Sequence, residues 1–476
     1  MLPKSTGVLY ERVAQQLREQ VLSGVYGPGD RVPSVRRLSE HYEVSIATVV
    51  EAYRRLEAQG VIEARPQSGY YVRARQWQAP VQPSISQPPC TPVNVNVSAL
   101  AMKLLKTSRD PQVLQLAVAA PHPDFLPVQA LNRILARLAR NDDGGYFGYD
   151  FPPGSPALRV QIARRALDAG MTLAPDDIVT TSGCQEAVSL SLRAVARPGD
   201  TIAIESPAFY GTLQTIERLG MKALEIPTCP RRGVALDALK LALERWKIKA
   251  CVFVLSYSNP LGSSMSEDNR RKLVKLLAEH EIPLIEDDIY GDLGFSATRP
   301  KTAKAFDRKG LVLLCSSFSK SLAPGYRVGW VVPGRYRDEI EHLKYTNTMA
   351  TATLPQLAIA EFLDHGGYDR YLRRTRALYA ASAERMTHAI ARHFPEDTKV
   401  TQPAGGFVLW VELPKKVDAL ELHRRALAKK INIAPGPLFS AKQKYRNFIR
   451  LTCALPWDER LERSLATLGR LAAEMA

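Results

Sequence analysis

The sequence has no apolar run long enough to cross a membrane, and its N-terminus has no signal-peptide pattern. It is also poor in residues that bind metals or form disulfides. There are six cysteines and eight histidines in 476 residues, and the cysteines are scattered without the spacing of a metal site. We therefore expect a cytoplasmic protein with reduced, mostly buried thiols, no metal centre and no contact with a membrane.

The chain is long and strongly basic. A length of 476 residues exceeds what one hydrophobic core usually supports, so two or more folding units are expected. The formal net charge of +16 is compatible with DNA binding. Residues 1–75 hold 11 Lys and Arg against 8 Asp and Glu, a net of +3, so most of the excess lies further along. The charge alone therefore does not assign a DNA-binding function.

The start of the chain carries the pattern of short helices followed by a hairpin. Apolar residues recur every four positions within 7–24, which predicts a helix with one buried face. Ser34 and Ser45 are predicted N-caps of two further helices, the second reaching about residue 59. The runs at 61–64 and 70–72 predict a hairpin wing, so the whole is typical of a winged helix-turn-helix. A generic three-helix bundle would show much the same apolar pattern, and the pattern alone does not decide.

Residues 5–73 resemble the winged helix-turn-helix of the GntR regulators, through GDRVPSVRRL at 29–38, VSIATV at 44–49 and AYRRL at 52–56. The resemblance implies binding of a double-stranded DNA operator through Ser34, Arg36, Ser45, Thr48, Arg54, Ser68 and Gly69. The chain departs from the family at Ile46, where an arginine is usual. One contact is therefore either absent or replaced by an apolar contact with a thymine methyl group.

The composition changes between residues 76 and 98, where Pro, Gln, Ser and Val dominate. We interpret 76–98 as a linker between a DNA-binding domain at 1–75 and a larger domain at 99–476. A proline-rich chain extends by about 3.1 Å per residue, so this segment could span on the order of 70 Å.

The larger domain alternates helical patterns with short apolar runs at 178–181, 201–204, 250–255, 283–285, 311–314 and 328–332. This alternation predicts an α/β fold with a mostly parallel sheet that helices cover on both faces. In such sheets ligands collect beyond the carboxyl ends of the strands. The residues that follow each run are therefore the candidates for a site.

Lys320 lies in the most informative stretch of the chain. It follows the apolar run at 311–314, and Ser317, Ser319 and Arg327 flank it at a spacing that suits a phosphate group. A lysine amine condenses with an aldehyde when desolvation lowers its pKa and neighbours hold it in place. Pyridoxal phosphate carries both an aldehyde and a phosphate. For this stretch alone, a surface lysine after a strand remains the alternative.

The ends of four other runs supply the remaining groups that this cofactor requires. Gly183 opens a helix whose free backbone N–H groups can hold the phosphate, and Phe209 can stack on a planar ring. Asn259 can donate a hydrogen bond, and Asp287 can keep the pyridine nitrogen protonated, which makes the ring an electron sink. Because the ends of all five strands match one cofactor, we favour a pyridoxal phosphate site over unrelated turns.

From about residue 110 to its end the chain is similar to the fold-type I aminotransferases, through SGCQEA at 182–187, SNPLG at 258–262, EDDIYG at 286–291, SSFSK at 316–320 and FIRLT at 448–452. The two halves together resemble the MocR-like branch of the GntR regulators. This implies a winged helix-turn-helix joined to an aminotransferase-like domain, whose smaller α/β lobe lies at about 333–476.

The resemblance also implies roles for single residues. Lys320 would be the catalytic lysine that binds the cofactor covalently, and Tyr149 would reach in from the second subunit of a homodimer. Arg450 would bind the α-carboxylate of a small amino compound, the effector, although a surface arginine is the alternative. The implied cofactor-binding set is Lys320, Asp287, Tyr290, Asn259, Phe209, Gly183, Cys184, Gln185, Ser317, Ser319, Arg327 and Tyr149.

Two of these residues depart from the family, which commonly has a hydroxyl at Cys184 and a tyrosine at Phe209. We expect the backbone contacts and the stacking to survive without those polar contacts.

Two functions remain open. The first is a transcription regulator whose aminotransferase-like domain senses an amino compound or the cofactor itself. The second is a working aminotransferase whose N-terminal domain is incidental. We prefer the first, because a small DNA-reading domain has no use in catalysis.

Overall fold

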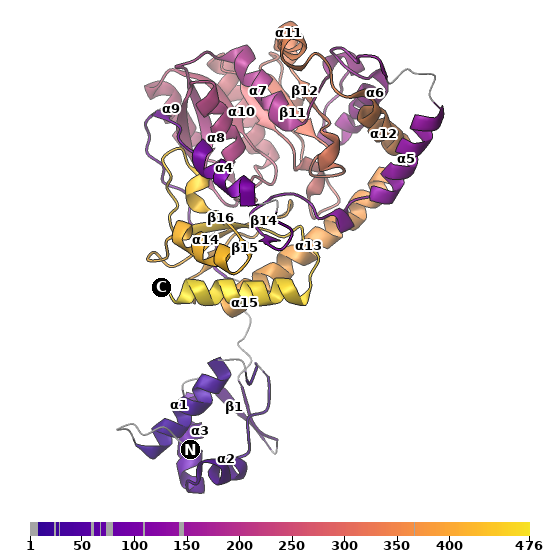
Figure 1. Cartoon of the computed structure of the whole chain (residues 1–476). Helices are drawn as coiled ribbons and strands as arrows, with labels where there is room; N and C mark the ends of the chain where they lie inside the picture. The colour runs from indigo at the N-terminus through magenta and orange to yellow at the C-terminus, as the bar shows by residue number, and fades with distance from the viewer. Residues whose placement is uncertain are drawn as a thin grey trace. The chain divides into compact units, whose positions relative to one another are not determined.

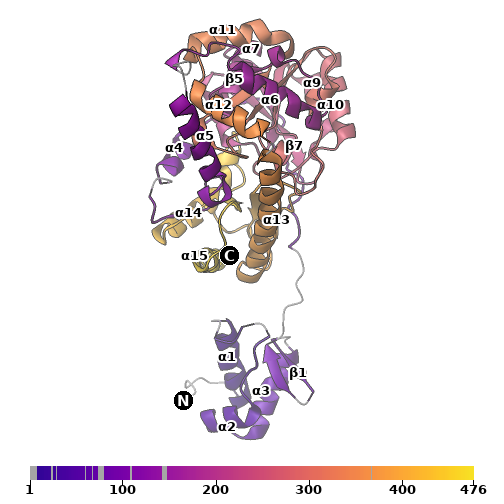
Figure 2. The ribbon, with the colours of Figure 1, turned by 90° about the vertical axis from the view of Figure 1, so that its right-hand side faces the viewer.

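The computed structural model describes residues 8–22, 25–27, 29–58, 61–66, 68–72, 80–107, 110–141, 147–365 and 367–476. The chain divides into two compact units, Met1–Gln78 and Ala79–Ala476, and each is described by itself (Figures 1 and 2). Among the described residues, no helix combines the length and the apolar character that a membrane span requires. The first part of the expected linker, 76–79, and the expected end of the third helix at residue 59 lie outside the described residues.

The N-terminal unit packs its helices and a hairpin around one core. Its elements are α1 (Leu9–Leu22), α2 (Val35–Tyr42), α3 (Ile46–Ala58), β1 (Ile62–Arg65) and β2 (Gly69–Val72). Ser34 and Ser45 cap α2 and α3: their Oγ atoms accept the backbone N–H groups of Arg37 at 3.3 Å and Thr48 at 3.1 Å. Because such caps fix where a helix begins, the turn between α2 and α3 is tight. The predicted helices and wing are confirmed.

The C-terminal unit is built on a large sheet in which the strands follow the order β3, β7, β6, β9, β10, β11, β12, β5. Their bounds are β3 (Val93–Asn94), β5 (Val179–Thr181), β6 (Thr201–Ser206), β7 (Lys222–Cys229), β9 (Ile248–Phe253), β10 (Leu284–Asp287), β11 (Val312–Ser317) and β12 (Gly329–Val332), and β8 (Gly233–Val234) pairs with β7. Strands β7, β6, β9, β10 and β11 are parallel, whereas β12 runs antiparallel to both of its neighbours. The predicted mostly parallel sheet is confirmed.

Helices cover both faces of this sheet. Ile202 and Leu313 pack with α7 and α8, whereas their chain neighbours Ala203 and Val312 pack with α9 and α10. The helices of the unit are α4 (Ser98–Thr107), α5 (Val128–Asn141), α6 (Pro156–Ala166), α7 (Cys184–Val195), α8 (Tyr210–Arg218), α9 (Leu236–Arg245), α10 (Glu267–Glu279), α11 (Arg337–Thr348), α12 (Thr353–Asp364), α13 (Gly367–His393), α14 (Ala419–Ala428) and α15 (Glu459–Ala473). The strands are mostly apolar on both faces, and the polar side chains of the candidate site follow their ends.

A smaller antiparallel sheet forms the second lobe, in the order β13, β14, β17, β16. The strands are β13 (Lys399–Val400), β14 (Val408–Glu412), β16 (Ala434–Pro435) and β17 (Phe448–Thr452), and β4 (Leu114–Gln115) pairs with β15 (Ile431–Asn432) beside them. Helices α14 and α15 and the second half of α13 share its core. The lobe boundary differs from the expected residue 333, because α11 packs against α7 and α12 packs against α5 and α6.

Residues 80–97, which we call the strap, are bonded to the C-terminal unit. Val81 accepts the backbone N–H of Val400 at 3.0 Å, and Ser86 Oγ accepts that of Thr228 at 2.8 Å. The indole Nε1 of Trp246 donates to the carbonyl of Cys90 at 3.1 Å, and β3 then joins the edge of the large sheet. Residues 80–97 of the predicted linker at 76–98 are therefore part of the C-terminal unit. An extended chain has unpaired backbone groups that a sheet edge can satisfy.

Candidate cofactor site

Lys320 lies just beyond the end of β11, where its Nζ donates to the carbonyl of Ala119 at 2.5 Å. Burial lowers the pKa of Lys320 to about 8, and the nearby guanidinium of Arg450 lowers it further than Asp287 raises it. Near neutral pH a usable fraction of this amine is therefore uncharged, and the uncharged amine is the form that attacks an aldehyde.

Asp287 is the last residue of β10 and is buried. Its Oδ1 accepts hydrogen bonds from Cys184 Sγ at 3.3 Å and from the backbone N–H of Ile289 at 3.2 Å. Burial nevertheless raises the pKa of Asp287 to about 6. No ion pair to this carboxylate is present among the described residues. A protonated ring nitrogen would supply the missing positive partner.

Several buried polar atoms around Lys320 have no hydrogen-bond partner among the described residues: Asn259 Oδ1, Tyr290 OH, and Nε and Nη1 of Arg450. Arg450 is fully buried in β17, so the alternative of a surface arginine is wrong, and its Nη2 donates to the carbonyl of Ala117 at 2.5 Å. Leaving such groups unpaired costs about 1 to 3 kcal/mol each. A ring hydroxyl can pair with Asn259 and Tyr290, and a carboxylate can pair with Arg450. The residues present therefore fit pyridoxal phosphate and an amino acid.

A cradle for a phosphate forms where α7 begins. Gly183 has a φ of 89°, and a Cβ at this position would overlap the guanidinium of Arg327. Arg327 donates to Ser319 Oγ at 3.1 Å and to the carbonyl of Ser182 at 3.0 Å, and Ser317 Oγ accepts the N–H of Ser319 at 3.2 Å. The first N–H groups of α7 have no acceptor in a preceding turn. Together with the arginine they suit an anion.

Other residues of the expected set point elsewhere. Cys184 donates to Asp287 as described, and Gln185 Nε2 donates to the carbonyl of Gly211 at 3.0 Å and to Thr215 Oγ1 at 2.7 Å. Both can therefore contribute to a phosphate cradle only through the backbone. The ring of Phe209 packs over Gly211, where a Cβ would overlap it.

Tyr149 lies on the surface, and no hydrogen bond joins its side chain to the described residues of the site. It is 72% exposed and stacks on Phe151 at 5.5 Å between ring centroids.

Sequence reasoning missed the carbonyl groups of Ala117 and Ala119, which bind the two functional cations of the site. An alanine gives no chemical signal, so no pattern could have found them. It also missed Tyr210, which contacts the ring of Phe439, the same ring that lies under the guanidinium of Arg450. The position of Tyr210 directly after Phe209 in the sequence could have indicated it.

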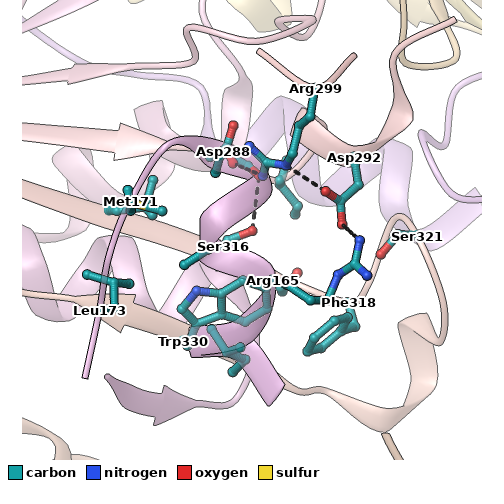
Figure 3. Close-up of a pocket in the computed structure, with 16 residues that line it drawn as sticks. Arg165, Met171, Leu173, Asp288, Asp292, Arg299, Ser316, Phe318, Ser321 and Trp330 are labelled. Atoms are coloured by element: carbon teal, nitrogen blue, oxygen red, sulfur yellow. Dashed lines mark hydrogen bonds and ion pairs between the residues drawn. The ribbon is translucent and has the colours of Figure 1, made fainter. Parts of the chain in front are cut away.

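A separate cavity lies against the face of β11 that carries Leu314 and Ser316 (Figure 3). Its space of about 40 Å³ holds a few water molecules but no amino acid. At its edge the guanidinium of Arg299 bridges Asp288 at 2.5 Å and Asp292 at 2.6 Å, as Figure 3 shows. This bridge fixes the turn after β10. It thereby helps to fix the position of Asp287, the residue before that turn. The cavity itself is not the cofactor site.

The expected DNA-contacting residues lie at the helix starts and in the hairpin of the N-terminal unit. Ser34 and Arg36 lie at the start of α2, Ser45 and Thr48 at the start of α3, and Arg54 is exposed further along α3. Ser68 lies in the turn of the wing and Gly69 begins β2, and Ser68 Oγ and Tyr71 OH are 2.6 Å apart.

Substitution of Asp287 should make the cofactor-free protein more stable at high pH. The pKa of Asp287 is raised from 3.8 to about 6 in the folded state, so its stabilising contribution is full below pH 4 and is lost as the pH rises through 6. The loss is on the order of 3 kcal/mol. Asp287→Asn mimics the protonated acid. Its melting temperature should exceed that of the wild type by a few degrees at pH 8 and approach it only below about pH 4.

Asp292→Asn is the matched control for this pH series. Burial raises the pKa of Asp292, but Arg299 and Arg165 more than offset that effect and hold the pKa at about 2. Loss of this carboxylate should therefore destabilise the protein at pH 8. A difference between Asp287→Asn and wild type that does not change with pH would contradict the assignment.

Comparison with known proteins agrees with both units. The family described as bacterial regulatory proteins, gntR family, matches residues 9–72, and aminotransferase class I and II matches residues 112–468. Among solved structures, the α-aminoadipate aminotransferase LysN of Thermus thermophilus, in complex with N-(5'-phosphopyridoxyl)-L-leucine, is similar with a TM-score of 0.74 and 28% identity. The match covers 80% of this chain and 96% of that one.

Two relatives from Escherichia coli K12 match over nearly their whole length. They are the uncharacterized HTH-type transcriptional regulators YjiR and YdcR. YjiR is 41% identical over 97% of this chain and 98% of its own, and YdcR is 42% identical over 98% and 99%. The resemblance to the MocR-like branch is confirmed, and the chain belongs to the HTH-type transcriptional regulators in which a GntR-type DNA-binding domain is fused to an aminotransferase class I and II domain.

Proposed function

We propose that this protein regulates transcription by binding duplex DNA through its N-terminal unit and responding to pyridoxal phosphate or an amino compound in its C-terminal unit. The relatives named as regulators support the first part. The observation that carries the second part is the route of the strap, because a series of hydrogen bonds connects this segment, which follows the DNA-binding unit in the chain, to residues beside the cofactor site.

The route runs through four residues. Ser86 of the strap pairs with Thr228, whose Oγ1 accepts the backbone N–H of Ser206 at 3.1 Å. Ser206 Oγ and Tyr445 OH are 2.8 Å apart. Ser206 ends β6, shortly before Phe209, and Tyr445 lies shortly before the strand that carries Arg450. The strap is thus connected to the ring-stacking side and to the carboxylate-binding side of the site.

Pyridoxal phosphate, when bound, supplies an aldehyde that captures amines and a ring that withdraws electrons. In this proposal Lys320 holds the aldehyde and Asp287 the ring nitrogen, while Asn259 and Tyr290 bind the ring hydroxyl. Arg450 binds the carboxylate of the amino compound. The unpaired buried atoms of Asn259, Tyr290 and Arg450 support the assignment, as does the phosphopyridoxyl group bound in the similar LysN structure.

A homodimer completes the proposal. Tyr149 would serve the site of the partner subunit, since its side chain is exposed and its ring stacks on Phe151. Phe147, Phe151 and Tyr345 are exposed beside it in the sequence or in space, and a partner subunit would cover them.

The alternative function is that of a working aminotransferase. The presence of Lys320, Asp287 and Arg450 in one site favours it. Multiple turnovers with an amino acid and a keto acid acceptor would support this function over a purely regulatory one.

The double variant Arg36→Ala, Thr48→Ala should bind duplex DNA more weakly than the wild type. Both residues lie at the starts of the helices that enter or flank the major groove. Loss of a base contact weakens binding by roughly 1 to 3 kcal/mol, and loss of one phosphate contact reduces the salt slope of the affinity by about 1. Affinities would be measured at several salt concentrations, on duplexes selected from a random library.

Arg18→Ala is the control for this experiment, because Arg18 is exposed on α1 and its loss changes the net charge as much as the loss of Arg36 does. An unchanged affinity and salt slope in the double variant would remove the proposed contacts.

A further inference from the structure

The first turn of α3 presents an apolar surface to solvent. Ile46 is 53% exposed, and Ala47 beside it is exposed as well. The opposite side of the helix is fully used by the core, through Val49, Ala52, Tyr53 and Leu56. A single exposed isoleucine is ordinary on a protein surface. Its position at the start of a recognition helix makes this one informative, because the first turn of that helix contacts base edges.

The hydroxyl groups of the same turn are already engaged. Ser45 Oγ accepts the backbone N–H of Thr48 and lies 2.8 Å from Thr48 Oγ1. The bond from the N–H of Thr48 caps α3, so Ser45 keeps its Oγ turned toward the start of the helix. The hydroxyls of Ser45 and Thr48 therefore already have a partner within this turn, whereas the side chain of Ile46 is exposed.

The rest of the exposed face is polar and carries both charges. Arg54 lies 3.9 Å from Glu51, one turn away on the same side of α3, in a pair open to solvent. Ile46 and Ala47 at the start of α3 suit an apolar group in the major groove, whereas Arg54 and Glu51 further along the helix suit polar groups. The apolar group that a base edge offers there is the C5-methyl of thymine.

We propose that Ile46, with Ala47 beside it, reads a thymine methyl group, so that each operator half-site carries a thymine opposite the first turn of α3. This inference rests on the proposed DNA binding and names the base that the helix selects. The sequence alone leaves open whether the contact made by an arginine elsewhere in the family is absent or replaced. The exposure of Ile46 and the engaged hydroxyls favour its replacement by an apolar contact.

The test removes the methyl group from the DNA. The full chain is first used to select duplexes from a random library, and each thymine of the selected duplex is then replaced singly by deoxyuridine, which lacks only the methyl. Burial of one methyl group corresponds to a change in affinity of about fourfold. The wild type should lose about that factor at one thymine of each half-site. Ile46→Ala should bind the thymine and uracil duplexes equally.

Two further variants sharpen the result. Val25→Ala removes methyl groups from an exposed valine outside the helices and should keep the full response to uracil. Ile46→Arg should replace thymine by guanine at that position in a new selection, because arginine pairs with the guanine edge.

The outcomes separate the inference from the function on which it rests. Equal binding of the wild type to every uracil duplex would overturn the thymine contact while leaving DNA binding intact, as would an unchanged selection by Ile46→Arg. Failure to select any duplex would instead remove the proposed DNA-binding function. The uracil series on the wild type needs no variant, so a folding defect cannot imitate the result.

Discussion

The Lys320→Ala variant should lose all covalent attachment of pyridoxal phosphate. Lys320 is the lysine whose pKa burial lowers to about 8, and the charges of Arg450, Asp287 and Arg327 act on it. Attachment requires the uncharged amine, so its rate in the wild type should rise with pH up to about 8 and then level off. The measurement is borohydride reduction after incubation with the cofactor, followed by mass spectrometry of the peptides.

Two control variants distinguish chemistry from folding. Lys320→Arg keeps the positive charge and a donor for the carbonyl of Ala119 but has no amine that forms the bond, so it should also give no adduct. Lys301→Ala removes a half-exposed lysine that pairs with Glu267 and should leave the yield unchanged. The same amount of reduced adduct in Lys320→Ala as in the wild type would place the cofactor on another lysine.

Much of the large sheet could be predicted because its strands are short, apolar and followed by polar turns. Strand β7 could not be predicted in this way. It contains Glu225 and Pro227, which interrupt the apolar pattern, yet Glu225 is buried and accepts the backbone N–H of Ala441 at 2.8 Å. Its acceptor role depends on a segment more than two hundred residues away in the chain. Local pattern cannot carry that information.

For the candidate site, the sequence predicted which residues come together but not where their side chains point. The ends of the strands predicted which residues gather, but not that the side chains of Cys184 and Gln185 turn away from the phosphate cradle. The proline-rich composition of 80–97 predicted an extended chain correctly, since proline favours that conformation. It could not indicate that Thr228 and Val400 accept this chain as a partner.

An amino acid that occupies the site should change the affinity for DNA by about 5- to 150-fold, the usual range of coupling between two sites. Lys320 follows the large sheet, whereas Arg450 lies in the smaller one. A compound with an amine and a carboxylate therefore binds best when the two lobes are close, and it shifts the protein toward that state. The strap is bonded to both lobes, through Thr228 and Val400.

Tyr445→Phe should reduce this coupling. It removes the bond to Ser206 and leaves the ring packed against Trp410 and Phe448. Tyr379→Phe is the matched control, because its buried hydroxyl has no hydrogen-bond partner among the described residues.

Each protein would be titrated with a panel of amino acids, with and without the selected duplex, while the cofactor absorbance is followed. Because coupling is reciprocal, DNA must change the affinity for the amino acid by the same factor that the amino acid changes the affinity for DNA. Identical curves with and without DNA for every amino acid that reacts would remove the sensing function, and rapid turnover with a keto acid would then favour the aminotransferase.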